Sequence, residues 1–122
     1  MPPPTGENPA GILNVFLAGI LFLVLIVRTR SLWMAVGLHA AWDWSQNFLF
    51  GVADSGIVLP GSLLRTTAHG PAWLTGGTVG PEGSVIGILI VSVAILYFAR
   101  ARWVCPSPDA ALLWAEYVSP RE

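Results

Sequence analysis

The sequence predicts an all-α, polytopic membrane protein with three transmembrane helices, which would form part of a larger helical bundle. Two observations favour this fold class. Of the 122 residues, 54% are hydrophobic and only 11% are charged, whereas about a quarter of the residues of a soluble domain are charged. Three apolar runs approach the length that crosses a bilayer, and none alternates as a strand does. Helices are therefore expected, since an open sheet could not satisfy its backbone groups in lipid.

The three apolar runs define a predicted membrane domain over residues 11–103. Its helices would cover about residues 11–27, 32–52 and 84–99. The first and third runs are slightly short for a hydrocarbon core of about 30 Å, so flanking residues would have to extend them. At the start of the third run, Gly83 and Gly87 form a Gly-x-x-x-Gly step that favours close approach of another helix.

Flanking arginines predict the orientation. Four of the six basic residues follow the first and third runs, namely Arg28, Arg30, Arg100 and Arg102. The positive-inside rule places both groups on the cytoplasmic side. The N-terminal segment 1–10 and the loop 53–83 would then be extracytoplasmic, and the tail 104–122 would be cytoplasmic. The net charge of -1 and the lack of a basic cluster beyond these arginines argue against nucleic-acid binding.

The loop and the tail leave alternatives open. At about thirty residues, loop 53–83 is longer than a simple connection, which is typical of a lid, a substrate-facing segment or disorder. His69 in this loop has no second ligand spaced near it, so a solvated histidine is expected. In the tail, Ser107 and Pro108 have the pattern of a helix start. The sequence after them fits either a short helix on the cytoplasmic surface or a frayed end.

The second apolar run carries a polar stripe. His39, Asp43 and Asn47 recur every four residues, so they share one helix face with a rise of about 6 Å between neighbours. Ionisable residues at this depth normally face a protein interior or a wet cavity. His39 and Asp43 could share a proton for acid–base chemistry, so they are the candidate catalytic residues. Asn47 and Trp42 are candidate supporting residues. For Asn47, as for Gln46, hydrogen bonding between helices is the alternative.

Two further candidates for chemistry are weaker. Glu82 could act as a base, but its expected place at the outer end of the third helix differs in depth from Asp43, and a helix N-terminus favours an acid for electrostatic reasons. His39 and Asp43 could give two ligands to a divalent metal, yet a catalytic zinc site uses three protein ligands and the sequence offers no third. No cofactor is therefore predicted. Cys105 is the only cysteine, which excludes an internal disulfide.

Several stretches resemble one known family. They are Phe16 to Gly19, Arg28 to Trp33, Gly37 to Asp43, Leu74 to Gly77 and Gly80 to Ser84. In combination they resemble the C-terminal half of the CAAX protease and bacteriocin-processing family, the intramembrane glutamic endopeptidases related to prenyl-protein proteases. The resemblance covers about residues 8–103.

The resemblance implies a membrane protease in which a glutamate activates water, a histidine assists it, and a His-x-x-x-Asn/Asp motif completes the site. His39 and Asp43 match that last motif. The implied partners are membrane lipid and a peptide or prenylated-protein substrate, and the implied location is a prokaryotic plasma membrane. The family's Glu-Glu pair and Phe-x-x-x-His motif are absent from this sequence. We therefore expect a C-terminal fragment that needs the missing N-terminal helices or a partner membrane protein.

Two other functions fit the same stripe. A non-catalytic accessory or immunity protein would use it to dock a partner helix. A proton-handling fragment would use the His39 and Asp43 pair as a relay.

Overall fold

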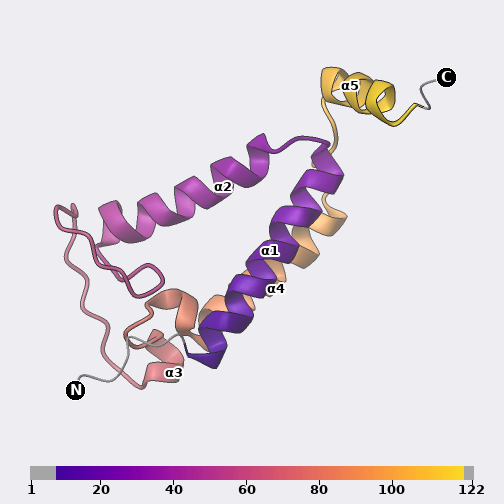
Figure 1. Cartoon of the computed structure of the whole chain (residues 1–122). Coiled ribbons are helices and arrows are strands. Elements are labelled where there is room, and N and C mark those ends of the chain that lie inside the picture. The colour runs from indigo at the N-terminus through magenta and orange to yellow at the C-terminus, as the bar shows by residue number, and fades with distance from the viewer. Residues whose placement is uncertain (1–7, 120–122) are drawn as a thin grey trace.

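The computed structural model describes residues 8–119, which fold as helices joined by loops (Figure 1). The elements in chain order are α1 (Pro9–Thr29), α2 (Trp33–Trp44), the π-helix η1 (Ser45–Phe50), α3 (Ala72–Thr75), the 3-10 helix η2 (Pro81–Gly83), α4 (Val85–Arg100) and α5 (Pro108–Val118). Within residues 8–119 there is no strand, only an isolated bridge between Asp54 and Ile57. The all-α prediction is confirmed. Most of the predicted N-terminal segment, residues 1–7, and the end of the tail, residues 120–122, lie outside the described part.

The first helix begins and ends with recognisable caps. The Asn8 side chain accepts a hydrogen bond from the Gly11 amide at 2.7 Å, and Pro9 occupies the first turn. The helix ends at Arg30, whose φ of 56° is left-handed. With 21 residues, α1 extends the expected helix by two residues at each end. At about 1.5 Å per residue it is long enough to cross a bilayer.

Length supports only one of the three predicted spans. Among the described helices, α1 alone is both long and apolar enough to cross a membrane, whereas α4, with 16 residues, is shorter. The second predicted span is divided into α2 and η1. Three spans are therefore not confirmed by helix length and composition.

The core lies between α1 and α4, which run side by side in the same direction (Figure 1). Leu21 and Leu25 of α1 are buried together with Val91 of α4 and Val104 beyond it. At the start of the pair, a Cβ on Gly87 would lie 2.5 Å from the carbonyl oxygen of Pro81 in η2 and 3.1 Å from the Asn14 side chain of α1. The absence of a side chain at Gly87 thus leaves room for the preceding turn and for a side chain of α1.

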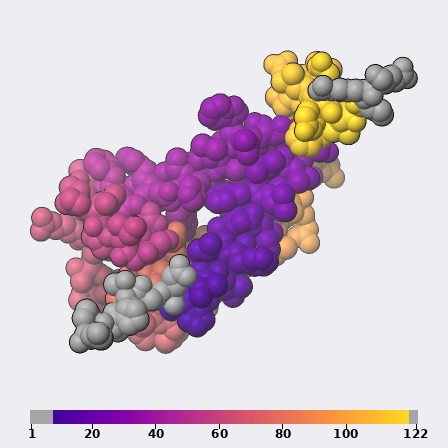
Figure 2. Space-filling model, in the orientation of Figure 1, coloured from indigo at the N-terminus to yellow at the C-terminus, as the bar shows by residue number. Residues whose placement is uncertain are grey.

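The second helix diverges from this pair. It leaves the C-terminal end of α1 and runs away from it at a wide angle (Figure 1). We call the open angle between α1 and α2 the α1–α2 wedge. The space-filling view shows a gap between the two helices (Figure 2). The described part of the chain has no further helix that fills this wedge.

The π-helix continues α2 and meets the long loop. Backbone amides of Leu63, Leu64 and Thr66 donate hydrogen bonds of 2.7, 3.0 and 3.2 Å to the carbonyl oxygens of Phe48, Leu49 and Phe50, respectively. These carbonyls are at a helix end, where no further helical amide can reach them. The loop after η1 therefore caps the C-terminal end of η1 as well as connecting it to α3.

The tail contains a helix where a helix start was expected. Ser107 accepts a hydrogen bond from the Ala110 amide at 3.2 Å, and α5 follows. Its Trp114 ring lies 5.1 Å from the Arg30 guanidinium carbon, which is close enough for a cation–π contact. The tail thus folds beside the C-terminal end of α1 and is not frayed over Pro108–Val118.

Candidate functional site

His39 and Asp43 form a close pair on α2. The His39 Nε2 atom lies 3.3 Å from Asp43 Oδ2, as their i, i+4 spacing predicts. The His39 ring also meets the edge of the Phe22 ring of α1, with the ring centroids 5.2 Å apart. The pair therefore faces α1 and borders the α1–α2 wedge.

The pair is largely open in the described part of the chain. The His39 side chain is 61% exposed and that of Asp43 is 40% exposed. The Phe22 ring of α1 packs edge-on against the imidazole. A polar pair that no other described helix covers agrees with the expectation that this chain needs further helices.

Asp43 contacts one imidazole nitrogen of His39, Nε2, and leaves the other, Nδ1, free for a second partner. A carboxylate at this distance favours the tautomer that carries its proton on Nε2. Nδ1 is then available to accept a proton or to hold a water. Asp43 in its ionised form only accepts hydrogen bonds, so it orients His39 and does not itself act as a donor.

The buried face of the second helix is offset from the predicted stripe. Gln46 in η1 is only 5% exposed, and Trp42, one turn before it, is half-buried. Asn47 is half-buried and donates hydrogen bonds to the Asp43 carbonyl oxygen at 3.1 Å and to Asp54 Oδ2 at 2.6 Å. Asn47 therefore bonds to a loop carboxylate, whereas the alternative in the sequence was a bond to another helix.

Glu82 lies nearer to this site than the sequence predicted. Its Oε1 accepts hydrogen bonds from Trp42 Nε1 at 2.8 Å and from Gln46 Nε2 at 3.2 Å. Its Oε2 accepts one from Ser55 Oγ at 2.6 Å. Glu82 was expected at a different depth from Asp43, but its carboxylate reaches Trp42, the residue before Asp43, and Gln46 of η1.

Asp54 is the second carboxylate at this end of the site. A turn places it, with positive φ angles of 47° at Ser55 and 85° at Gly56, the combination found in type I′ turns. Burial is the first cause that raises the pKa of Asp54, and the charges of Glu82 and Asp43 add to the rise. The hydrogen bond from Asn47 and the charge of His39 lower it. Asp54 thus shares an electrostatic environment with the candidate pair.

Sequence reasoning did not identify the group formed by Glu82, Asp54, Ser55 and Gln46. Glu82 follows Trp42 by 40 positions, and no helical period connects them. The one available signal was chemical. Two acids in a loop that follows a helix rich in side-chain donors indicate a set of hydrogen bonds, but not which donor meets which acid.

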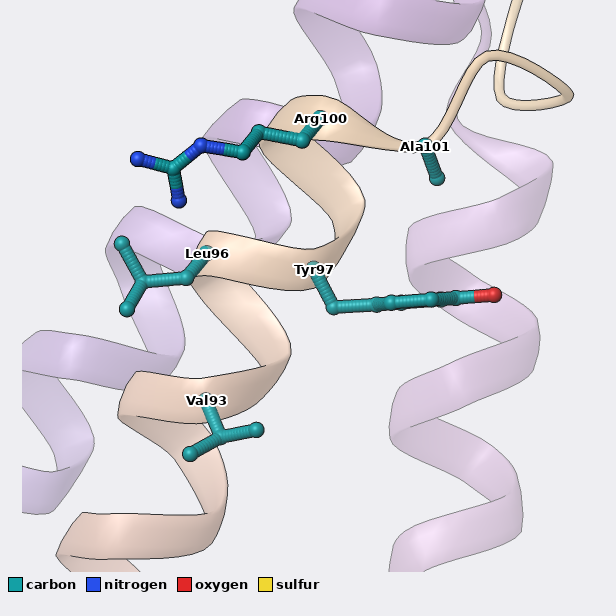
Figure 3. A pocket seen from close by; sticks show the side chains of 5 residues that line it. All are labelled: Val93, Leu96, Tyr97, Arg100 and Ala101. Atoms are coloured by element: carbon teal, nitrogen blue, oxygen red, sulfur yellow. The ribbon is translucent and has the colours of Figure 1, made fainter.

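One small hollow lies near these residues. A cavity of about 20 Å³, enough for a single water, is lined by Glu82 and Ser55 together with Gly11, Val15 and Val79. A larger open concavity of about 430 Å³ lies along α4 (Figure 3). Figure 3 shows Arg100 and Leu96 on one side of that helix and Tyr97 on the other. The concavity along α4 shares no residue with the candidate site.

The described residues do not assemble a metal site. Across residues 8–119, no three His, Cys, Asp or Glu side chains group as ligands. His39 and Asp43 would be two ligands without a third. His69 is exposed in the loop, as expected.

Comparison with known proteins gives one match. Residues 3–45 match the family described as type II CAAX prenyl endopeptidase Rce1-like. The match covers the N-terminal third of the chain and includes α1, His39 and Asp43. The resemblance predicted from the sequence is confirmed over these residues, while its part at 74–84 lies outside the match. No curated protein and no solved structure matches the chain.

Proposed function

We propose, from the match over residues 3–45, that the chain is the C-terminal part of an intramembrane endopeptidase of the CAAX prenyl protease type. It would hydrolyse peptide bonds of membrane-associated substrates, with His39 and Asp43 in the active site. The observation that carries this proposal is the pair itself. His39 Nε2 lies 3.3 Å from Asp43 Oδ2, and the His39 ring meets the Phe22 ring of α1.

Each residue of the pair has a distinct role in this proposal. Asp43 orients the imidazole, and the free Nδ1 of His39 accepts a hydrogen bond from the attacking water. The general base is a glutamate outside this sequence, because the Glu-Glu pair and the Phe-x-x-x-His motif are absent from it. Helices that carry those motifs would fill the α1–α2 wedge and exclude water from the pair.

The proposed setting is a prokaryotic plasma membrane with three spans, from α1, from α2 with η1, and from α4. One contact supports a common cytoplasmic end. Arg28 donates a hydrogen bond to the Ala101 carbonyl oxygen at 2.6 Å, which brings the ends of α1 and α4 together. Both arginine groups therefore lie at the same end of the helix pair, as the positive-inside rule requires.

The test is peptide hydrolysis in membranes. The chain is co-expressed with a membrane polypeptide that supplies the Glu-Glu and Phe-x-x-x-His helices, and an internally quenched farnesylated peptide is the probe. His39→Ala should lower the hydrolysis rate by about 100-fold or more, the usual range for loss of acid–base assistance. His69→Ala is the matched control, because His69 is exposed in the loop and should leave the rate unchanged. Equal rates for the two variants would exclude His39 from the chemistry.

A non-catalytic docking role is the second candidate, and the exposure of the pair favours it. Side chains that are 61% and 40% exposed can bind a polar group on a partner helix without any reaction. The same co-expression separates the two functions. Co-purification that depends on His39, with no hydrolysis in the wild type, would indicate docking by an accessory or immunity protein.

A further inference from the structure

Glu82 has a fixed backbone. The Asn14 side-chain amide of α1 donates to the Glu82 carbonyl oxygen at 3.0 Å, and Asn14 is only 4% exposed. The Asn8 side-chain amide donates a hydrogen bond to the carbonyl oxygen of the next residue, Gly83, at 3.1 Å. The turn that carries Glu82 is therefore held against the first turns of α1, so its carboxylate projects from a rigid support.

From this support the carboxylate reaches two points on one face of the second helix. Trp42 and Gln46 are four residues apart, which places them one above the other. Both donate to Glu82 Oε1, at 2.8 and 3.2 Å. Hydrogen bonds to a charged acceptor are roughly twice as strong as neutral ones. Two such bonds on one face restrict rotation of α2 about its axis as well as its distance from α4.

His39 lies on the same side, three residues before Trp42. Its ring contacts Phe22 edge-on, and this is the one aromatic contact between α1 and α2 in residues 8–119. His39 and Trp42 are both on α2, so they turn together when the helix rotates about its axis. A rotation of α2 that moved Trp42 would therefore also move His39 relative to Phe22. The two hydrogen bonds to Glu82 and the contact between the His39 and Phe22 rings together hold the second helix at three points.

We infer that Glu82 is a positioning residue for the His39 and Asp43 pair. By holding Trp42 and Gln46, it sets the rotation of α2 that directs the pair towards the α1–α2 wedge. The inference rests on the proposed function for its catalytic consequence. It goes beyond the electrostatic role that an acid at the start of α4 would have, because a dipole contact would stabilise α4 without fixing α2.

Histidine resonances test this geometry without any activity measurement. The chain has two histidines, so its imidazole Cε1–H spectrum in lipid nanodiscs contains two signals, assigned by His39→Ala and His69→Ala. Glu82→Ala removes the acceptor of both bonds. It should move the His39 signal by more than its linewidth, as the Phe22 ring changes its relative position, and leave the His69 signal in place. An unchanged His39 signal in Glu82→Ala, with a folded far-UV spectrum, would overturn the inference.

A second variant guards against misfolding of the first. Trp42→Phe keeps an aromatic ring but removes the indole donor, so it should move the His39 signal in the same direction. The double variant should move it no further than Glu82→Ala alone, because Glu82→Ala already removes the bond that Trp42→Phe removes. Ser55→Ala is the matched control. It removes the 2.6 Å bond to Glu82 Oε2 without touching α2, so His39 should not respond. Additive shifts, or an equal response to Ser55→Ala, would overturn the inference.

Hydrolysis of the farnesylated peptide is scored separately in the co-expressed assembly. Glu82→Ala should lower kcat about tenfold with little change in KM, since a positioning residue acts on the reacting groups and not on the remote parts of the substrate. A wild-type assembly that hydrolyses the peptide with a kcat that Glu82→Ala leaves unchanged would overturn the inference. A chain that shows the His39 shift but hydrolyses nothing refutes the proposed peptidase alone.

Discussion

The carboxyl group of Asp54 is held where its charge is unfavourable. Its pKa is raised first by burial and then by Glu82, with Asp43 adding to the effect and Asn47 and His39 opposing it. In the pH range between its unfolded and its raised folded pKa, the folded chain binds more protons than the unfolded chain. Stability is therefore greatest below this range and falls as the pH rises through it.

Asp54→Asn should stabilise the chain at neutral pH. Asparagine keeps an oxygen that accepts the 2.6 Å bond from Asn47 but carries no charge near Glu82. The expected gain is roughly 2 °C in Tm, because a partly exposed and screened group contributes only a fraction of a kcal/mol. Thermal unfolding followed by near-UV circular dichroism at pH 4 and pH 7 measures it. The gain should be present at pH 7 and absent at pH 4, and a loss of stability at pH 7 would contradict the assigned direction.

Two variants separate the hydrogen bond that Asp43 makes to His39 from the negative charge of Asp43. If Asp43 only orients His39, Asp43→Asn should hydrolyse the peptide at a rate within about tenfold of the wild type, since an amide oxygen can accept the same hydrogen bond from His39. Asp43→Ala removes the acceptor and should lower the rate by about 100-fold. The ratio of the two rates in the co-expressed assembly is the measurement. Equal losses in both variants would show that the carboxylate charge itself is required.

At the scale of the elements, the pairing of α1 and α4 depends on a missing side chain. An added Cβ at Gly87 would lie 2.5 Å from the Pro81 carbonyl oxygen and 3.1 Å from Asn14 Nδ2. Backbone cannot move from such a contact as a flexible side chain can. The close approach also brings Asn14 within reach of the Glu82 carbonyl oxygen.

Gly87→Ala should destabilise the chain by about 1–3 kcal/mol, the usual cost of overpacking. Gly19→Ala is the matched control, because Gly19 is also inside an apolar helix but a Cβ there would meet nothing within 4 Å. It should be neutral, or stabilising by up to about 1 kcal/mol through its helix propensity. Tm values in detergent give the comparison. A Gly19→Ala loss as large as that of Gly87→Ala would exclude the close contacts of Gly87 with Pro81 and Asn14 as the cause.

The helices were predictable from the sequence, while the network that joins them was not. Apolar runs and cap residues such as Ser107 predicted where helices occur, because these signals are local. The π-helix after Trp44 has no such signal, and it offsets the buried face so that Gln46 becomes the deeply buried polar residue. The bond between Trp42 and Glu82 depends on the path of the intervening loop, which composition does not determine.

For the whole molecule, the unique cysteine reports the proposed orientation. Cys105 is exposed and follows α4, at the end where the two arginine groups gather. A membrane-impermeant maleimide should label it in inverted membrane vesicles and leave it unlabelled in intact spheroplasts. Labelling only in intact spheroplasts would reverse the proposed topology.

The loop provides the opposite control in the same experiment. Thr67 is exposed between η1 and α3. In a Cys105→Ser background, Thr67→Cys should react in intact spheroplasts and not in inverted vesicles. Reaction of both positions from the same side would contradict a span formed by α4.

The hydrogen bond between Trp42 and Glu82 also sets an order of events during biosynthesis. A chain emerges from the ribosome N-terminus first, and Glu82 follows Trp42 by 40 residues. Trp42 is therefore synthesised before its acceptor. If α2 and η1 form one of the proposed spans, Asp43 opposes their entry into the membrane, since an aspartate at the centre of an inserting helix costs roughly 3 kcal/mol. The bond that fixes α2 can form only after the segment leading to α4 has been made.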